Sequence, residues 1–165
     1  MGAVDTVLAS GHRLRLFRPS DREACLAVFD SNVPDFFGVH ERREYVEFLG
    51  SLPGPYWVLE EGAGLIVGAG GYALVEDEGR ADLCWGMVHG ARHGEGLGRT
   101  LTEVRMDQAL RHPRVREFRI STSQHTRGFY ERLGFRVIET IPEGFGPGMD
   151  RCDMRWSDRN EGINQ

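Results

Sequence analysis

Three glycines, Gly94, Gly96 and Gly98, stand at every second position after an apolar strand that ends at Val88. They form a turn that leads into a segment starting at about Gly96. Such a turn exposes backbone N–H groups where a helix starts, and these groups have no partner inside the helix. The helix dipole adds partial positive charge at the same point. The spacing therefore predicts a phosphate-binding site.

Two common phosphate loops do not fit this spacing. The nucleoside triphosphate loop needs a lysine where Arg99 stands and a glycine where His93 stands. The dinucleotide fingerprint needs a third glycine, which neither Gly94-x-Gly96 nor Gly96-x-Gly98 has at the required distance. Another phosphate-bearing ligand is therefore expected.

A second block follows the glycine turn. Residues 117–123 alternate as a strand does, and the segment after them carries Tyr130 and closes on Gly134 and Phe135. The two blocks together resemble the GNAT superfamily of N-acetyltransferases. Its acyl-CoA pyrophosphate loop has the pattern Q/R-x-x-G-x-G/A.

On this sequence Gly96 and Gly98 take the two small positions of that loop. His93 stands where the family has Gln or Arg, and Arg92 lies one residue earlier. The loop binds phosphate mostly through backbone N–H groups. A histidine in place of Gln or Arg therefore weakens the motif but does not remove phosphate binding by the loop.

The resemblance implies that acetyl-CoA, and so coenzyme A, binds between two neighbouring parallel strands that splay apart, residues 81–89 and 117–123. The residues implied to contact it lie at the end of the first strand, in the glycine turn and around the second block. They are Met87, Val88, Arg92, His93, Gly94, Glu95, Gly96, Leu97, Gly98, Arg99, Thr100, Ser123, Gln124, Phe129 and Tyr130.

The resemblance also implies catalytic roles. Tyr130 matches the tyrosine that protonates the departing thiolate, and a backbone N–H near the end of the first splayed strand would bind the oxyanion. Gly86 makes a bulge plausible there. Asp82 is the leading base candidate because it lies on that strand, with His89 and His125 as alternatives. Residues of these types at such positions are more often hydrogen-bonded structural or surface residues, and that alternative stays open for each of the three.

The amine acceptor would be held by residues outside these motifs. Phe36, Phe37 and Phe145 are candidate walls of its pocket. A metal site is not expected, because His89 and His93 lack a third ligand at a sensible spacing. The predicted activity is direct acetyl transfer from acetyl-CoA to a primary amine of a small molecule or peptide. The alternative is a catalytically silent module that senses acyl-CoA.

Composition bounds the class of protein. The chain has 165 residues, 40% of them hydrophobic and 27% charged, which predicts a single domain, residues 1–165. The resemblance to the GNAT family implies a core over about residues 12–156. A net charge of −5 disfavours nucleic acid as a partner. No apolar run reaches the length of a membrane span, and three cysteines without a C-x-x-C pair suit the cytoplasm. A homodimer is compatible with this reading.

The periodicity predicts the elements that must position these residues. Strands are expected at residues 13–17, 56–60, 64–75, 81–89, 117–123, 135–141 and 152–156. Helices are expected at 20–30, with Ser20 and Glu23 as a capping box, around Tyr45, from about 96 to 111, and up to 133. Their order resembles an α+β GNAT fold: a mixed sheet of about seven strands with about four helices in α/β/α layers. Residues 157–165 are a predicted polar tail.

Overall fold

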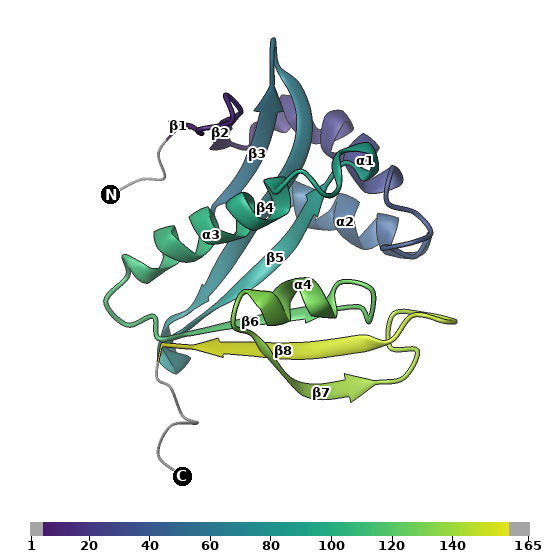
Figure 1. The fold of residues 1–165 in the computed structure, drawn as a ribbon, viewed down its shortest axis with the longest axis vertical. Helices are drawn as coiled ribbons and strands as arrows, with labels where there is room; N and C mark the ends of the chain where they lie inside the picture. The colour runs from purple at the N-terminus through teal and green to yellow at the C-terminus, as the bar shows by residue number, and fades with distance from the viewer. Residues whose placement is uncertain (1–4, 159–165) are drawn as a thin grey trace.

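The computed structural model describes residues 5–158, whose backbone forms one mixed sheet of eight strands (Figure 1). The sheet order is β1-β2-β3-β4-β5-β6-β8-β7, and every neighbouring pair is antiparallel except β5 with β6. The predicted mixed sheet is confirmed, with one strand more than expected because residues 6 and 7 pair with β2. The strands are β1 (Thr6–Val7), β2 (Arg13–Leu16), β3 (Tyr56–Glu61), β4 (Leu65–Val75), β5 (Arg80–Val88), β6 (Glu117–Thr122), β7 (Arg136–Ile141) and β8 (Arg151–Ser157).

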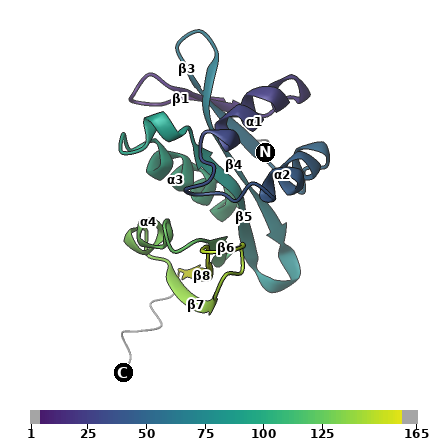
Figure 2. The same ribbon diagram turned by 90° about the vertical axis from the view of Figure 1, so that its right-hand side faces the viewer.

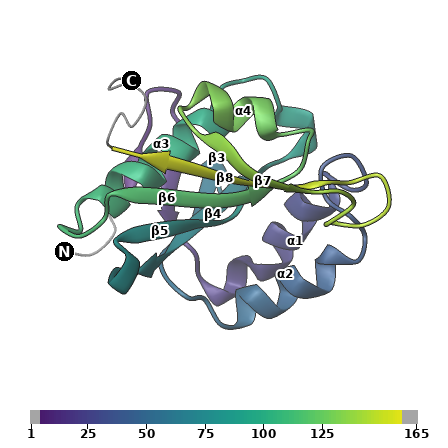
Figure 3. The ribbon, with the colours of Figure 1, turned by 90° about the horizontal axis from the view of Figure 1, so that it is seen from below.

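Four α-helices cover the two faces of this sheet. Helices α1 and α2 lie on one face and α3 and α4 on the other, as Figures 2 and 3 show from two directions. Among residues 5–158, no helix is long and apolar enough to cross a bilayer. The predicted three-layer arrangement is confirmed. The helices are α1 (Arg22–Asp30), α2 (Glu41–Gly50), α3 (Leu97–Leu110) and α4 (Arg127–Arg132).

The core has one cluster on each face of the sheet, and β3 contributes to both. Trp57 and Leu59 pack with residues of α3, whereas Tyr56 and Val58 pack with residues of α1 and α2. Side chains alternate between the two faces along a strand. A run of apolar residues in β3 is therefore buried on both sides, and it anchors the helices of both layers.

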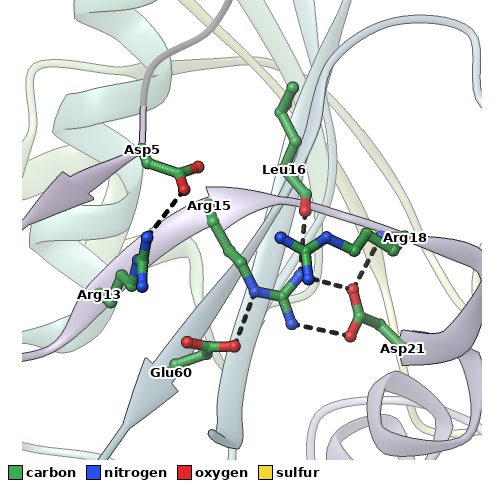
Figure 4. Close-up of polar contacts among 7 residues, drawn as sticks. All are labelled: Asp5, Arg13, Arg15, Leu16, Arg18, Asp21 and Glu60. Carbon is green, nitrogen blue, oxygen red and sulfur yellow. Dashed lines mark hydrogen bonds and ion pairs between the residues drawn. The ribbon is translucent and has the colours of Figure 1, made fainter.

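The N-terminal part of the sheet is fastened by a buried arginine on β2 (Figure 4). Arg15 Nε donates to Glu60 at 2.7 Å, and its two terminal nitrogens donate to the two carboxylate oxygens of Asp21 at 2.8 and 2.9 Å. Asp21 and Arg15 are 6% and 7% exposed. Because both carboxylates come from different segments, Arg15 ties β2 to β3 and to the start of α1.

The start of α1 differs from the prediction. The helix begins at Arg22 after a 3-10 turn, Pro19–Asp21, and its N-cap is Asp21. The Asp21 carboxylate accepts the backbone N–H of Arg18 at 2.7 Å. The predicted Ser20–Glu23 capping box is therefore wrong: the N-cap is Asp21, one residue after Ser20, and its carboxylate binds Arg15 and Arg18 and makes no cap bond to α1.

The two ends of the chain lie partly outside the described residues. Strand β8 continues to Ser157, one residue beyond the predicted core and into the predicted polar tail. Residues 159–165 of that tail lie outside the described range.

Candidate active site

Strands β5 and β6 diverge after a short paired stretch, as the ribbon shows (Figure 1). The two strands pair in parallel only from Arg80 to Asp82 and from Glu117 to Arg119. A cavity of about 1070 Å³ opens beyond this point, lined by residues from the α1–α2 side and from the α3–α4 side. The predicted splaying is confirmed, and it gives a ligand access to both faces of the sheet.

A bulge in β5 shapes the middle of the cleft. Met87 lies opposite Ala69, but Cys84 lies opposite Gly71, so β5 has one residue more than β4 between these pairs. Trp85 has a φ of +43°, which is rare for a residue with a side chain. In the sequence Gly86, next to it, is compatible with a bulge, and the strand register places one there.

Two buried tyrosines hold the bulge. The Tyr56 hydroxyl donates to the Trp85 carbonyl at 2.8 Å, and the Tyr45 hydroxyl lies 2.9 Å from that of Tyr56. Both tyrosines are at most 2% exposed. The backbone strain at Trp85 is therefore stabilised from the α2 side. The N–H groups of Met87 and Val88, predicted to serve the oxyanion, follow directly after this bulge.

The glycine turn has the conformation that its spacing predicts. Gly94 and Gly96 have φ values of +85° and +80°, and α3 begins at Leu97 without a side-chain cap at its N-terminus. The first N–H groups of α3 are thus left for a ligand. His93 Nε2 lies 2.9 Å from the Val88 carbonyl, so this side chain closes the turn onto β5.

The two arginines beside the turn are already engaged. Arg92 pairs with Glu61 at 2.7 Å, and Arg99 pairs with Glu103 at 2.6 Å. Both guanidinium groups are partly exposed and line the cleft, so a phosphate would compete with a carboxylate for them. Of the turn residues predicted to bind the cofactor, Glu95 and Thr100 do not line the cleft.

Tyr130 lies on α4 and forms part of the cleft wall. It is 6% exposed and packs edge-on against Phe129 and Phe135, with ring centroids 4.9 and 5.5 Å away. Burial raises the pKa of the Tyr130 phenol above its ordinary value. The phenol therefore keeps its proton at neutral pH and can act as a hydrogen-bond donor or an acid.

Asp82 faces the cleft from β5, but it is not free. One of its carboxylate oxygens accepts from Arg80 Nε at 2.9 Å. Two residues on, Cys84 donates from Sγ to the Asp82 carbonyl at 3.3 Å, and burial raises the pKa of this thiol to about 11. A nucleophilic Cys84 thiolate is disfavoured for that reason. The alternative base His125 lines the cleft, whereas the His89 ring accepts the Ala91 N–H at 3.1 Å.

The residues after β6 divide between the cleft and a loop. Ser123 is buried, lines the cleft and accepts the His125 N–H at 3.2 Å. Gln124 does not line the cleft. Its amide donates to the Gly148 carbonyl at 2.9 Å and accepts the Asp150 N–H at 2.8 Å, so it fastens the loop between β7 and β8.

The three predicted acceptor residues all line the cleft. The Phe36 ring contacts the His93 ring edge-on, with centroids 4.9 Å apart, whereas Phe37 stacks on the core residue Phe29 at 4.8 Å. Phe145 belongs to the loop that Gln124 fastens. Two separate segments, the one between α1 and α2 and the loop between β7 and β8, thus both contribute aromatic rings to the cleft.

Three further cleft residues escaped sequence reasoning: Asn32, Trp85 and Arg105. Asn32 donates to the Val88 carbonyl at 3.0 Å and joins the end of α1 to the end of β5, a contact that no local pattern indicates. Arg105 could have been noticed, because it follows Leu97 and Leu101 at the spacing of the buried face of α3.

Comparison with known proteins adds the family. The family profile described as Acetyltransferase (GNAT) domain matches residues 53–137, which is about half of the chain and includes β3 to α4. That stretch contains the bulge, the glycine turn and Tyr130. No curated protein matches the chain by sequence.

Solved structures agree with this match. A protein from Desulfovibrio desulfuricans, described as an acetyltransferase of the GNAT family, is 25% identical, with a TM-score of 0.74 over 88% of this chain and 98% of that chain. The ribosomal-protein-S18-alanine N-acetyltransferase of Escherichia coli is 17% identical, with a TM-score of 0.73 over 93% and 98%. A Salmonella typhimurium protein described as an acetyltransferase, with its cofactor acetyl-CoA, is 19% identical, with a TM-score of 0.66 over 99% of both chains. The last two share the fold.

Proposed function

Since the chain belongs to the GNAT family of acetyltransferases, we propose that it transfers an acetyl group from acetyl-CoA to the primary amine of a small molecule or peptide. The observation that carries this proposal is the placement of two features on one cleft. An uncapped helix N-terminus with its glycine turn lies on the cleft, and the buried Tyr130 phenol lies on its wall. Three free cysteines are consistent with a cytoplasmic location.

The glycine turn fits the pyrophosphate of acetyl-CoA. Gly94 and Gly96 leave the first N–H groups of α3 without side-chain partners, and these donors suit phosphate oxygens. Acetyl-CoA supplies an activated thioester, which an amine can attack directly. Arg92 and Arg99 would bind phosphate oxygens if they released their present partners, Glu61 and Glu103. Their positive charges would then strengthen phosphate binding.

Tyr130 is the proposed general acid. Its phenol is protonated at neutral pH because burial raises the pKa, and it faces the cleft between the splayed strands. The N–H groups after the β5 bulge are the proposed donors to the developing oxyanion. Each role places a donor where negative charge forms during the transfer.

Asp82 is the proposed base, acting directly or through water. The ion pair with Arg80 orients its carboxylate and leaves one oxygen for the amine. We expect Asp82→Asn to lower kcat at least tenfold at neutral pH, because general-base catalysis contributes about 100-fold or more. Unchanged kcat in this variant would remove Asp82 from the mechanism and leave His125 as the candidate.

The proposal is tested by following free thiol. Purified protein is incubated with acetyl-CoA and a panel of primary amines: an alkylamine, an arylalkylamine, lysine and a peptide with an N-terminal alanine. We expect amine-dependent thiol release, and Tyr130→Phe should lower turnover at least tenfold with little change in the affinity for acetyl-CoA. Acetyl-CoA binding without thiol release on any amine would favour the acyl-CoA sensor. Absence of binding would contradict both functions.

A further inference from the structure

A buried charged side chain, that of Arg105, contributes to the wall of the cleft. Arg105 is on the face of α3 that is turned to the sheet, four residues after Leu101, and it is 1% exposed. The neighbouring positions at this spacing, Leu97, Leu101 and Ala109, are buried and apolar. An arginine at such a position carries a large desolvation cost, so its charge calls for an explanation.

The partners of Arg105 do not neutralise it. One terminal nitrogen donates to the Gly71 carbonyl at 3.2 Å, and the other donates to the Thr102 hydroxyl at 3.2 Å. Nε has no hydrogen-bond partner. Within residues 5–158, no carboxylate lies at ion-pair distance from Arg105, although the other buried arginine, Arg15, contacts two.

The surrounding backbone is shaped to admit this guanidinium. A Cβ added at Gly86 would lie 2.5 Å from a terminal nitrogen of Arg105, and one added at Gly70 would lie 3.1 Å from the guanidinium. Glycine on each of two adjacent strands, β4 and β5, thus leaves the space that the cation fills. Gly86 is next to the residue with positive φ in the β5 bulge, so the charge sits at the part of the cleft assigned to the reaction.

The ionisable groups near Arg105 become negative when they lose a proton. The positive charge of Arg105 lowers the pKa values of three such groups: the Tyr130 phenol, the Tyr56 phenol and the Cys84 thiol. Burial raises the same pKa values by more, so the net shift of each is upward. Arg105 and Tyr130 line the same cleft, and Arg105 is the one charged group that shifts the pKa of that phenol. Of the three groups, Tyr130 is the one proposed to release a proton during the reaction.

We propose that Arg105 is a positioning residue for the transfer, and that its buried guanidinium stabilises the phenolate that Tyr130 becomes when it gives up its proton. This inference rests on the proposed function. The amine nitrogen forms a bond to the thioester carbonyl carbon, the carbon–sulfur bond breaks, and the sulfur leaves with the electron pair. The sulfur takes the Tyr130 proton, which leaves a phenolate. The acylated nitrogen gives up one proton to the proposed base, Asp82; Asp82 returns that proton to solvent, and the phenolate takes one from solvent to become the phenol again. Arg105 lowers the energy of the stage at which the buried phenolate exists.

The first test needs neither acetyl-CoA nor an amine. The near-ultraviolet absorbance of phenolate is titrated with pH in the wild type and in Tyr130→Phe, and the difference reports Tyr130 alone. We expect Arg105→Met to raise the midpoint of this difference by roughly one pH unit or more, because a nearby opposite charge shifts a pKa by that amount. Arg105→Lys keeps the charge, so its midpoint should stay close to that of the wild type. Arg43→Met, at an exposed position, should leave the midpoint unchanged. An unshifted midpoint in folded Arg105→Met would overturn the inference.

The second test uses turnover with the best amine of the panel. Arg105→Met should lower kcat about tenfold with the KM for acetyl-CoA within twofold of the wild type. In the Tyr130→Phe background the same change should have little effect, because Arg105 acts through Tyr130. An equal loss in both backgrounds would show that Arg105 acts otherwise and would overturn the inference. A shifted midpoint without thiol release on any amine would instead refute the proposed function.

If Arg105→Met does not fold, the wild type still decides. Tyr45 is buried in the other core cluster, where burial raises its pKa and no arginine acts on it. The difference titration for Tyr130→Phe should therefore have a lower midpoint than that for Tyr45→Phe. Equal midpoints, or a higher one for Tyr130, would contradict the inference.

Discussion

Gly96 is the residue whose substitution tests the phosphate-binding turn most directly. Its φ is +80°, and an added Cβ would meet no atom within 4 Å, so alanine there is strained but not obstructed. The strain is about 1–2 kcal/mol. Alanine also restricts the unfolded chain, which offsets about 0.4–1 kcal/mol. The free energy of unfolding should fall by about 1 kcal/mol, and the melting temperature by roughly 2–4 °C.

The effect of Gly96→Ala on binding should be larger. If residue 96 leaves the left-handed conformation, the N–H groups at the start of α3 turn away from the pyrophosphate of acetyl-CoA. Loss of one hydrogen bond to a charged group costs about 1.5–3 kcal/mol. The Kd for acetyl-CoA should therefore rise roughly 10- to 150-fold.

Gly11→Ala is the matched control. Gly11 has a φ of +87° and open space around its Cβ position, but it lies between β1 and β2. Calorimetric titration with acetyl-CoA and thermal unfolding are measured for both variants. The two should lose similar stability, and only Gly96→Ala should bind more weakly. The reasoning fails if Gly96→Ala binds within twofold of the wild type, or if Gly11→Ala weakens binding as much.

The remaining predictions concern stability. Asp21→Asn leaves the buried Arg15 with a single carboxylate. Chemical denaturation should show a free energy of unfolding lower by about 2–3 kcal/mol. A loss below about 0.5 kcal/mol, the size expected for an exposed ion pair, would contradict this. Arg15 lowers the pKa of Asp21 below its unfolded value, so this contribution is complete above about pH 4 and is lost as the pH falls through the folded pKa. Denaturation between pH 2 and about 5 should therefore show a weaker acid dependence in Asp21→Asn than in the wild type, and parallel curves would be against it. Gly86→Ala should cost about 1–3 kcal/mol because its Cβ overlaps Arg105, whereas Gly50→Ala, with no atom within 4 Å of its added Cβ, should not destabilise; equal melting temperatures would refute the overlap.

Several elements could be predicted because their signals are local. The glycine turn, the start of α3 near Leu97 and its end before Pro113 follow from backbone preferences of neighbouring residues. The meander of β3, β4 and β5 follows from short turns between apolar runs. The Ser20–Glu23 capping box failed for the opposite reason, since Arg15 of the preceding strand hydrogen-bonds Asp21, a side-chain contact that depends on how the strand packs beside the helix.

The candidate site was predicted unevenly. Tyr130 and most of the glycine turn line the cleft as the resemblance implied, whereas Gln124 is used to hold the loop that bears Phe145. A glutamine that binds backbone groups of a distant loop has the same sequence signature as one that binds a cofactor. The choice between these uses depends on which segment folds beside it.

The sequence by itself determined where a phosphate could sit, because positive φ and uncapped N–H groups at Gly94 and Gly96 are properties of a few adjacent residues. It also determined, through the family resemblance, the acetyltransferase fold. Only the tertiary structure decided where charge lies in the cleft. Arg105 is buried where Gly70 and Gly86 on two strands leave it room, and Tyr130 of α4 lines the same cleft. That environment exists only when segments far apart in the chain pack together, since desolvation and electrostatic coupling depend on three-dimensional distance.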